Sequence, residues 1–320
     1  MTRFILRRVA ISVLMLIATS LLVFTVLRLL PGDPVITRLG STPGVDAAMI
    51  ERLRAEAGLD APIWQQYLNW IGGMFRGDFG QSYFNQFSVN ELIAQRLPTT
   101  LELTLISVLL AVLIAVPTAV IASLKPLGWL DRFLTAISTA GMALPQFLIG
   151  IVLIIVFAVT LRWLPARGYV PFTEDPGLNL TGMILPTITL ALASAPLLIR
   201  FLRASMIETL AAPFIRTARG KGVDRAGVVV GHALRNALIP GLTMLGLVVG
   251  YTLGGVVIIE YVFGIPGLGS LAIDSVFKRD YAVLQSVVLL ISAMFILTSL
   301  IVDLLYGVLD PRLRVGKNRG

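Results

Sequence analysis

The sequence of 320 residues has no cysteine, only one histidine and none of several motifs on which common catalytic and metal sites depend. It has no cysteine, so neither a disulfide framework nor a thiolate metal site can form. Its single histidine, His232, has no second histidine with which to share a metal ion. The patterns GxxxxGKS, GxxxxGKT, GxSxG and HExxH are all absent. We therefore expect no catalytic residue, metal or cofactor on this chain, and we do not expect it to be an enzyme.

Charged residues are also scarce. They make up 14% of the chain, whereas 56% of the residues are hydrophobic and the mean hydropathy is +0.87. A soluble domain of this size does not need so much apolar surface, but a membrane helix bundle does. Only Asp303 is expected well inside a membrane span, although proton- and sodium-coupled carriers usually place charged groups in their pathway. If the protein drives uphill transport, another chain must supply the energy.

Six apolar segments are long enough to cross a bilayer, which takes about 20 helical residues. These segments cover residues 9–30, 103–124, 133–161, 182–202, 237–260 and 283–309. The sequence therefore predicts an all-α, polytopic membrane protein with six transmembrane helices. Four prolines lie in these spans and are expected to kink their helices: Pro117, Pro145, Pro186 and Pro196.

The distribution of cations predicts the orientation of the chain. Arg3, Arg7 and Arg8 precede the first span, and short cytoplasmic segments are enriched in lysine and arginine. An even number of spans returns the C-terminus to the same side. The predicted organisation is a cytoplasmic N-terminus (1–8), a first transmembrane helix (9–30), an extracytoplasmic region (31–98), a five-helix transmembrane core (99–310) that contains a cytoplasmic loop (204–236), and a cytoplasmic C-terminus (311–320).

The extracytoplasmic region is long enough to have its own shape. Residues 46–54 and 62–70 each read as an amphipathic helix, and the second carries aromatic residues suited to a membrane interface. Thr99 and Glu102 have the spacing of a capping box, which predicts that the second span opens at Thr99.

The stretch 215–240 is rich in cations although it lies between two apolar spans. Phe214, Ile215 and Ala218 are expected on a short helix among these cations, a pattern suited to filling a groove in a partner protein. Gly220 and Gly222 are expected to end that helix and turn the chain. The alternative is an ordinary solvated loop that is basic only because it is cytoplasmic.

Several short motifs follow one another along nearly the whole chain. They are Leu29–Pro34 (LLPGDP), Arg76–Gly80 (RGDFG), Arg96–Glu102 (RLPTTLE), Arg216–Gly222 (RTARGKG), His232–Pro240 (HALRNALIP), Glu260–Phe263 (EYVF), Pro266–Gly269 (PGLG) and Asp303–Arg312. Their order and spacing resemble those of the inner-membrane permease subunit of ABC importers for dipeptides and oligopeptides. That branch also includes nickel, glutathione and some oligosaccharide systems.

The resemblance implies a type I ABC importer permease in the bacterial plasma (inner) membrane. It implies a second, homologous permease, two ATP-binding-cassette ATPase subunits that bind ATP and Mg²⁺, and an extracytoplasmic substrate-binding protein. Alternating access would then be driven by the partner ATPases. Peptide is the expected substrate, with nickel chelate, glutathione or oligosaccharide as alternatives. A passive channel or secondary carrier is disfavoured by the uncharged span centres, and an intramembrane enzyme by the missing pairs of catalytic groups.

In such permeases a cytoplasmic loop carries a glutamate-alanine-alanine signature, three further residues and a glycine, and its short helix docks in a groove of the ATPase. If Gly222 is that glycine, Arg216 and Thr217 depart from the signature and Ala218 keeps it. The resemblance implies ATPase-coupling roles for Phe214, Ile215, Arg216, Thr217, Ala218, Arg219, Lys221, Gly222 and Asp224. It also implies that residues 31–98 and the loop 261–282 meet the binding protein.

Overall fold

The computed structural model describes residues 2–29, 47–56, 58 and 60–309. The described residues form α-helices, two short π-helices and one isolated β-bridge between Gln81 and Ser88, which confirms the all-α class. The predicted C-terminal segment 311–320 lies outside the described residues, as do residues 31–46, 57 and 59 of the predicted extracytoplasmic region.

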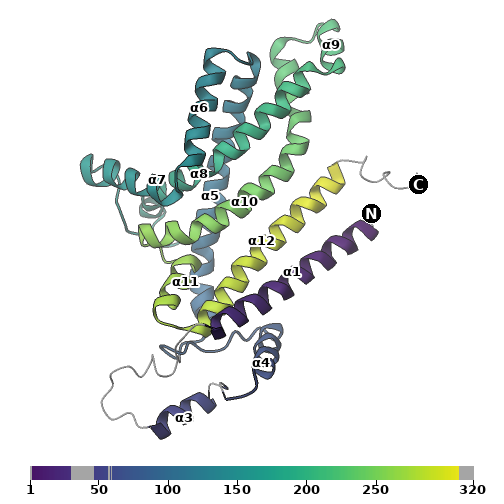
Figure 1. Ribbon diagram of the computed structural model, residues 1–320. Helices are drawn as coiled ribbons and strands as arrows, with labels where there is room; N and C mark the ends of the chain where they lie inside the picture. Colours follow the sequence, from purple (N-terminus) through teal and green to yellow (C-terminus); the bar gives the residue numbers. More distant parts are fainter. Residues whose placement is uncertain (1, 30–46, 57, 59, 310–320) are drawn as a thin grey trace.

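Figure 1 shows how the helices are arranged. In chain order the elements, with η for a π-helix, are α1 (Thr2–Leu29), α3 (Ala47–Glu56), α4 (Ile63–Phe75), α5 (Val89–Leu124), α6 (Trp129–Ala143), α7 (Gln146–Leu153), η1 (Ile154–Thr160), α8 (Pro176–Ala211), α9 (Pro213–Gly220), η2 (Gly227–Leu234), α10 (Arg235–Phe263), α11 (Leu268–Phe277) and α12 (Tyr281–Leu309). Five segments of the described chain are long and apolar enough to cross a membrane: α1, α5, α8, η2 with α10, and α12. The bent run from α6 to η1 makes a sixth if it is counted as one span.

The predicted third span, 133–161, is not one continuous helix. The chain bends by 103° between α6 and α7. Leu144 takes the extended conformation (ψ 130°) that is favoured before a proline, and Pro145 precedes the first residue of α7. Pro186 and Pro196, by contrast, lie inside α8, which continues through both. Of these three prolines, Pro145 alone interrupts its helix, so the span breaks there.

The second long helix begins earlier than the sequence predicts. α5 starts at Val89, so the prediction that a capping box at Thr99 and Glu102 opens this helix is wrong. Thr99 is buried within the helix, and Glu102 accepts a hydrogen bond from the Tyr169 hydroxyl (3.1 Å). The additional turns are stabilised by packing, because Val89 and Ile93 are buried in a cluster with residues of α11 and α12.

The centre of the bundle is built on small residues. Ala111, Ala115 and Ala119 recur every four residues along α5 and are buried against Ala191 and Ala195 of α8. Such stripes let helices approach closely in a membrane. The glycines of α10 serve a similar purpose, because Gly246 faces Val302 and Gly250 faces Phe295, both on α12. Packing therefore accounts for these two glycines.

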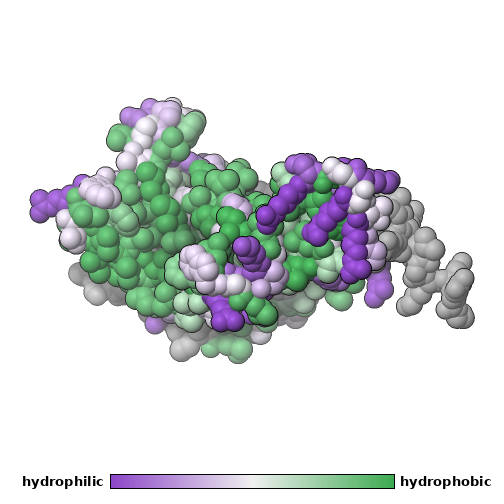
Figure 2. Space-filling model, turned by 90° about the horizontal axis from the view of Figure 1, so that it is seen from above, coloured by the Kyte–Doolittle hydropathy of each residue, from purple (hydrophilic) through white to green (hydrophobic). Residues whose placement is uncertain are grey.

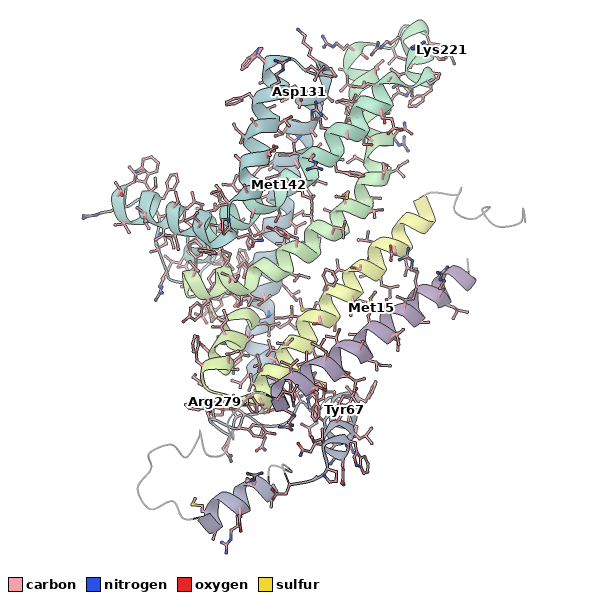
Figure 3. The ribbon with its side chains drawn as sticks, in the orientation of Figure 1. Met15, Tyr67, Asp131, Met142, Lys221 and Arg279 are labelled. Carbon is pink, nitrogen blue, oxygen red and sulfur yellow. The ribbon has the colours of Figure 1, made fainter. Side chains whose placement is uncertain are left out.

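The described helices form an elongated bundle with two ends (Figure 3). Figure 3 places Asp131 and Lys221 at one of them, which we call the α9 end, and Tyr67 and Arg279 at the other, which we call the α4 end. α1, α12 and α10 run alongside one another between the ends (Figure 1). Each candidate site described below belongs to one of these ends.

Candidate functional site

The short helix α9 follows α8 after a single residue. Ala212 is extended (φ −66°, ψ 148°) and Pro213 opens α9 at a position where the missing N–H has no intrahelical acceptor anyway. Within α9, Ile215 and Ala218 are buried and lie three residues apart, so they share one face of the helix. The predicted short amphipathic helix in this loop is therefore present.

A small core holds α9 to its own chain. The buried members of this core come from α8, α9, η2 and α10: Met206, Ile215, Ala218, Val228, Val229, Ala233 and Ala237. Ile215 has 0% exposure, whereas its neighbour Phe214 is 44% exposed. The sequence presents both as apolar groups for a partner, but the structure separates them. Ile215 anchors α9 internally, and Phe214 is the large apolar side chain that α9 displays.

The end of α9 is a complete glycine-terminated turn. The Gly222 N–H donates to the Arg219 carbonyl (3.0 Å), and the Val223 N–H donates to the Ala218 carbonyl (3.2 Å). These two bonds define a Schellman motif, in which the residue after the helix is left-handed. Gly222 has φ +80°, as the sequence predicts. Gly220 remains inside the helix, so the expectation that both glycines end it holds only for Gly222.

The next helical segment is capped by Asp224. Its carboxylate accepts the Gly227 N–H (3.2 Å) and its carbonyl accepts the Val228 N–H (2.9 Å). Three features therefore hold α9 in place. Pro213 starts the helix, the buried Ile215 packs it against the rest of the chain, and the Schellman turn and the Asp224 cap follow its end. α9 is therefore held in direct contact with α8 and η2.

The exposed surface of α9 is cationic. Arg216, Arg219 and Lys221 are exposed and form no ion pair with any described residue, and Thr217 is exposed beside them. Figure 2 looks onto this end and shows hydrophilic residues gathered over α9 beside a largely hydrophobic surface. A cavity of about 380 Å³ adjoins this surface, lined by Leu124, Leu210, Arg219, Val223, Arg225, Val228 and Val229. This surface suits a partner that accepts one aromatic side chain and carries negative charge.

A partly buried ion pair lies at the same end. The Arg203 guanidinium of α8 donates through Nε and Nη2 to the two carboxylate oxygens of Asp131 in α6, the latter at 2.6 Å. Asp131 also accepts the N–H of Leu127 (2.8 Å), a non-glycine residue at φ +63°. The pair therefore holds the turn between α5 and α6 against α8.

The α4 end contains a buried carboxylate that the sequence analysis did not single out. Glu260 of α10 has 0% exposure and accepts the Thr100 hydroxyl (2.6 Å) and the N–H groups of Gly269 (2.7 Å) and Ser270 (3.1 Å). Thr100 in turn accepts the Leu268 N–H (2.8 Å). Glu260 and Thr100 together satisfy the start of α11, where a negative charge is favourable.

The motifs EYVF and PGLG, which are separate in the sequence, form one structural unit here. A Cβ atom on Gly267 would overlap the Glu260 carboxylate, and one on Gly269 would overlap the backbone of Val257. The signal that could have revealed Glu260 is therefore the pair of glycines that leave it room.

The helix α4 packs its aromatic residues on α1. The Phe24 ring lies 5.4 Å from the Tyr67 ring and 5.9 Å from the Trp70 ring, and the hydroxyls of Ser20 and Tyr67 are 2.8 Å apart. Trp64, however, is 66% exposed. The predicted second amphipathic helix is thus present, with one aromatic face on α1 and another apolar face uncovered.

Residues 107–315 match the family model described as the binding-protein-dependent transport system inner membrane component, and residues 1–104 match the model of its N-terminal part. The chain belongs to this family. It is 41% identical over 314 residues to the glutathione transport system permease protein GsiC of Escherichia coli (strain K12), covering 98% of this chain and 99% of GsiC. It is 38% identical over 311 residues to the probable peptide ABC transporter permease protein y4tP of Sinorhizobium fredii, covering 97% and 99% of the two chains.

The fold agrees with this membership. An inward-facing structure of the MetNI methionine ABC transporter matches with a TM-score of 0.58 at 17% identity, covering 68% of this chain and 96% of that chain. The family and the fold identify the protein as a permease subunit of an ABC importer and a multi-pass inner-membrane protein. The resemblance of the ordered motifs to such permeases is thereby confirmed.

Proposed function

We propose that this permease pairs with a second, homologous permease and moves peptides by alternating access, powered by two ATPase subunits that bind ATP and Mg²⁺. One observation carries the proposal: α9 is packed onto its own chain through Ile215, and it exposes Phe214 among cations that form no ion pair with any described residue. A helix that must transmit motion needs both properties, a rigid attachment on one side and a contact surface on the other.

The proposed orientation places the α9 end in the cytoplasm and the α4 end outside. Its support is the group of cations exposed at the α9 end, since short cytoplasmic segments are rich in lysine and arginine. They include Lys125, Arg132, Arg216, Arg219, Lys221, Arg225 and Arg235. In this orientation the ATPases meet α9, and the uncovered face of α4 with Trp64 is available to the extracytoplasmic binding protein.

Peptide is the proposed substrate class. The named relatives are a probable peptide permease and a glutathione permease, and glutathione is itself a tripeptide. The same architecture carrying nickel chelate or oligosaccharide is the alternative, and measurements on the cognate binding protein would separate these substrates. A secondary carrier is disfavoured because Asp303, the ionisable residue expected well inside a span, is already paired with Arg8.

The decisive experiment removes the aromatic side chain that α9 displays. Filling a partner groove with a phenylalanine stabilises the contact by roughly 1.5–3 kcal/mol, whereas an exposed ion pair contributes about 0–1 kcal/mol. Phe214→Ala should therefore abolish ATP-dependent uptake into vesicles and reduce co-purification of the ATPase subunits, and Arg219→Ala should have a smaller effect.

Phe133→Ala is the matched control, because Phe133 is similarly exposed (55%) but lies on α6. If the Phe214 and Phe133 variants both show wild-type uptake and ATPase recovery, α9 is an ordinary solvated loop and the proposal fails.

A further inference from the structure

A groove distinct from the α9 surface lies between α5, α8 and the first half of α10. Its volume is about 460 Å³, within the range of about 300–1,000 Å³ that is usual for small-molecule sites. It is lined by Val112, Val116, Leu198, Leu202, Arg235, Leu238, Ile239, Gly241, Leu242 and Leu245. Arg235 is the one polar residue in this set. The lining suits a hydrocarbon chain and offers a hydrophilic peptide almost no hydrogen-bond partners.

The groove is built by one chain. Its walls come from three helices, and α10 lies close to α8 at Gly241, where an added Cβ would lie 2.9 Å from a methyl carbon of Leu202. Pro240, directly before it, has no N–H to continue the helical hydrogen bonds of α10. A partner helix in a membrane packs best on a flat face of small residues. A concave groove of leucine and valine instead fits a flexible chain.

Arg235 gives the groove a cationic mouth. It is exposed at the junction of η2 and α10, and no described residue forms an ion pair with it. Arg203, also at the α9 end, by contrast donates two hydrogen bonds to the carboxylate of Asp131. A guanidinium without a carboxylate partner is well suited to a phosphate group, which it can bind through two parallel hydrogen bonds.

We propose that this groove binds an anionic phospholipid of the inner leaflet, with one acyl chain between α5, α8 and α10 and the phosphate on Arg235. The leaflet assignment rests on the proposed orientation, in which the α9 end faces the cytoplasm. Anionic lipids give that leaflet its negative surface potential, so lipid charge and groove charge are complementary. The groove lies next to η2, because Arg235 directly follows that helix, and η2 packs against α9. A bound lipid would therefore make the connection between α9 and the bundle more rigid.

The test measures lipid retained by the assembled transporter. The complex of both permeases and the ATPases is reconstituted with phosphatidylglycerol or with phosphatidylcholine of the same acyl chains, and bound lipid is counted by native mass spectrometry. Wild type should retain phosphatidylglycerol in preference to phosphatidylcholine. Arg235→Gln should lower the affinity for phosphatidylglycerol about tenfold, the lower end of the effect of losing one hydrogen bond to a charged group, and Arg235→Lys should lower it less.

Two further variants keep the result interpretable. Arg225→Gln removes the same charge from the same end but outside the groove, so it should retain the lipid preference. Val116→Phe fills the groove and should reduce retention of both lipids. The proposal fails if the assembled complex holds no phosphatidylglycerol. It also fails if Arg235→Gln and Arg225→Gln behave alike, or if inorganic phosphate alone competes as well as the lipid.

Discussion

Arg8 of α1 is ion-paired with Asp303 of α12, 295 positions later in the chain. Asp303 is the ionisable residue that the sequence places well inside the last span, and the structure supplies its partner. The pair ties the first helix to the last, consistent with their packing along one another in Figure 1. Asp303 is therefore explained by helix association, and a role in ion coupling is unnecessary.

Removing one partner of this pair should loosen α1 from the bundle. We expect Asp303→Asn to lower the stability of the inserted permease by about 0.6 kcal/mol, the average measured for polar contacts between membrane helices, and by at most about 1.7 kcal/mol. The charge exchange Arg8→Asp with Asp303→Arg should recover most of the loss. Thermal unfolding in detergent provides the measurement. Equal stability of Asp303→Asn and wild type would show that the pair contributes nothing.

The turn after α9 should respond to substitution through backbone conformation alone. A Cβ at Gly222 would meet no atom within 4 Å, yet φ is +80°. A branched residue there costs about 1–2 kcal/mol of backbone strain and would redirect α9. We expect Gly222→Val to abolish ATP-dependent uptake while the permease still inserts, and Gly222→Asn to be better tolerated because asparagine accepts this conformation.

Gly220→Ala is the control for that experiment. Gly220 is helical with open space around it, so alanine should be neutral or slightly stabilising. Loss of uptake in Gly220→Ala but not in Gly222→Val would contradict the assigned turn.

The Thr100 hydroxyl should matter more than a comparable hydroxyl one turn away. Thr100 donates to Glu260 and accepts the Leu268 N–H, so Thr100→Val leaves two buried groups without this partner. Each such loss costs about 1–3 kcal/mol. Thr104 is also buried, but among the described residues its hydroxyl bonds only to the carbonyl of Thr100 in its own helix. Thermal unfolding should show a larger destabilisation for Thr100→Val than for Thr104→Val, and the reverse order would rule out this cap of α11.

The orientation can be tested with single cysteines, because the natural chain has none. Lys221 and Asp60 are both exposed, and they lie on opposite sides of the membrane in the proposed topology. A membrane-impermeant thiol reagent added to intact spheroplasts should label Asp60→Cys and spare Lys221→Cys until the membrane is opened. Labelling of Lys221→Cys from outside would invert the proposed topology and separate α9 from the ATPases.

Some of these features follow from local sequence. Membrane insertion depends on the length and apolarity of each segment, which are readable without a structure. The helix α9 and its turn are also local, since Pro213 starts the helix and Gly222 adopts a positive φ that glycine accepts more readily than other residues. The sequence also contains no cysteine and no nucleotide-binding or hydrolase motif. From this we expect a transport component without its own ATPase site.

Other features depend on contacts between distant residues, which periodicity cannot reveal. Pro145 breaks its span whereas Pro186 and Pro196 do not, and local sequence does not distinguish them. The burial of Ile215 depends on its packing against α8 and η2, which the local sequence does not show. The partner of Asp303 is likewise known only once α1 is placed beside α12. The sequence by itself determined that helices would form and enter a membrane, because those free energies are local. Tertiary structure decided where helices start, break and pair, because these choices depend on which distant residues satisfy each buried group.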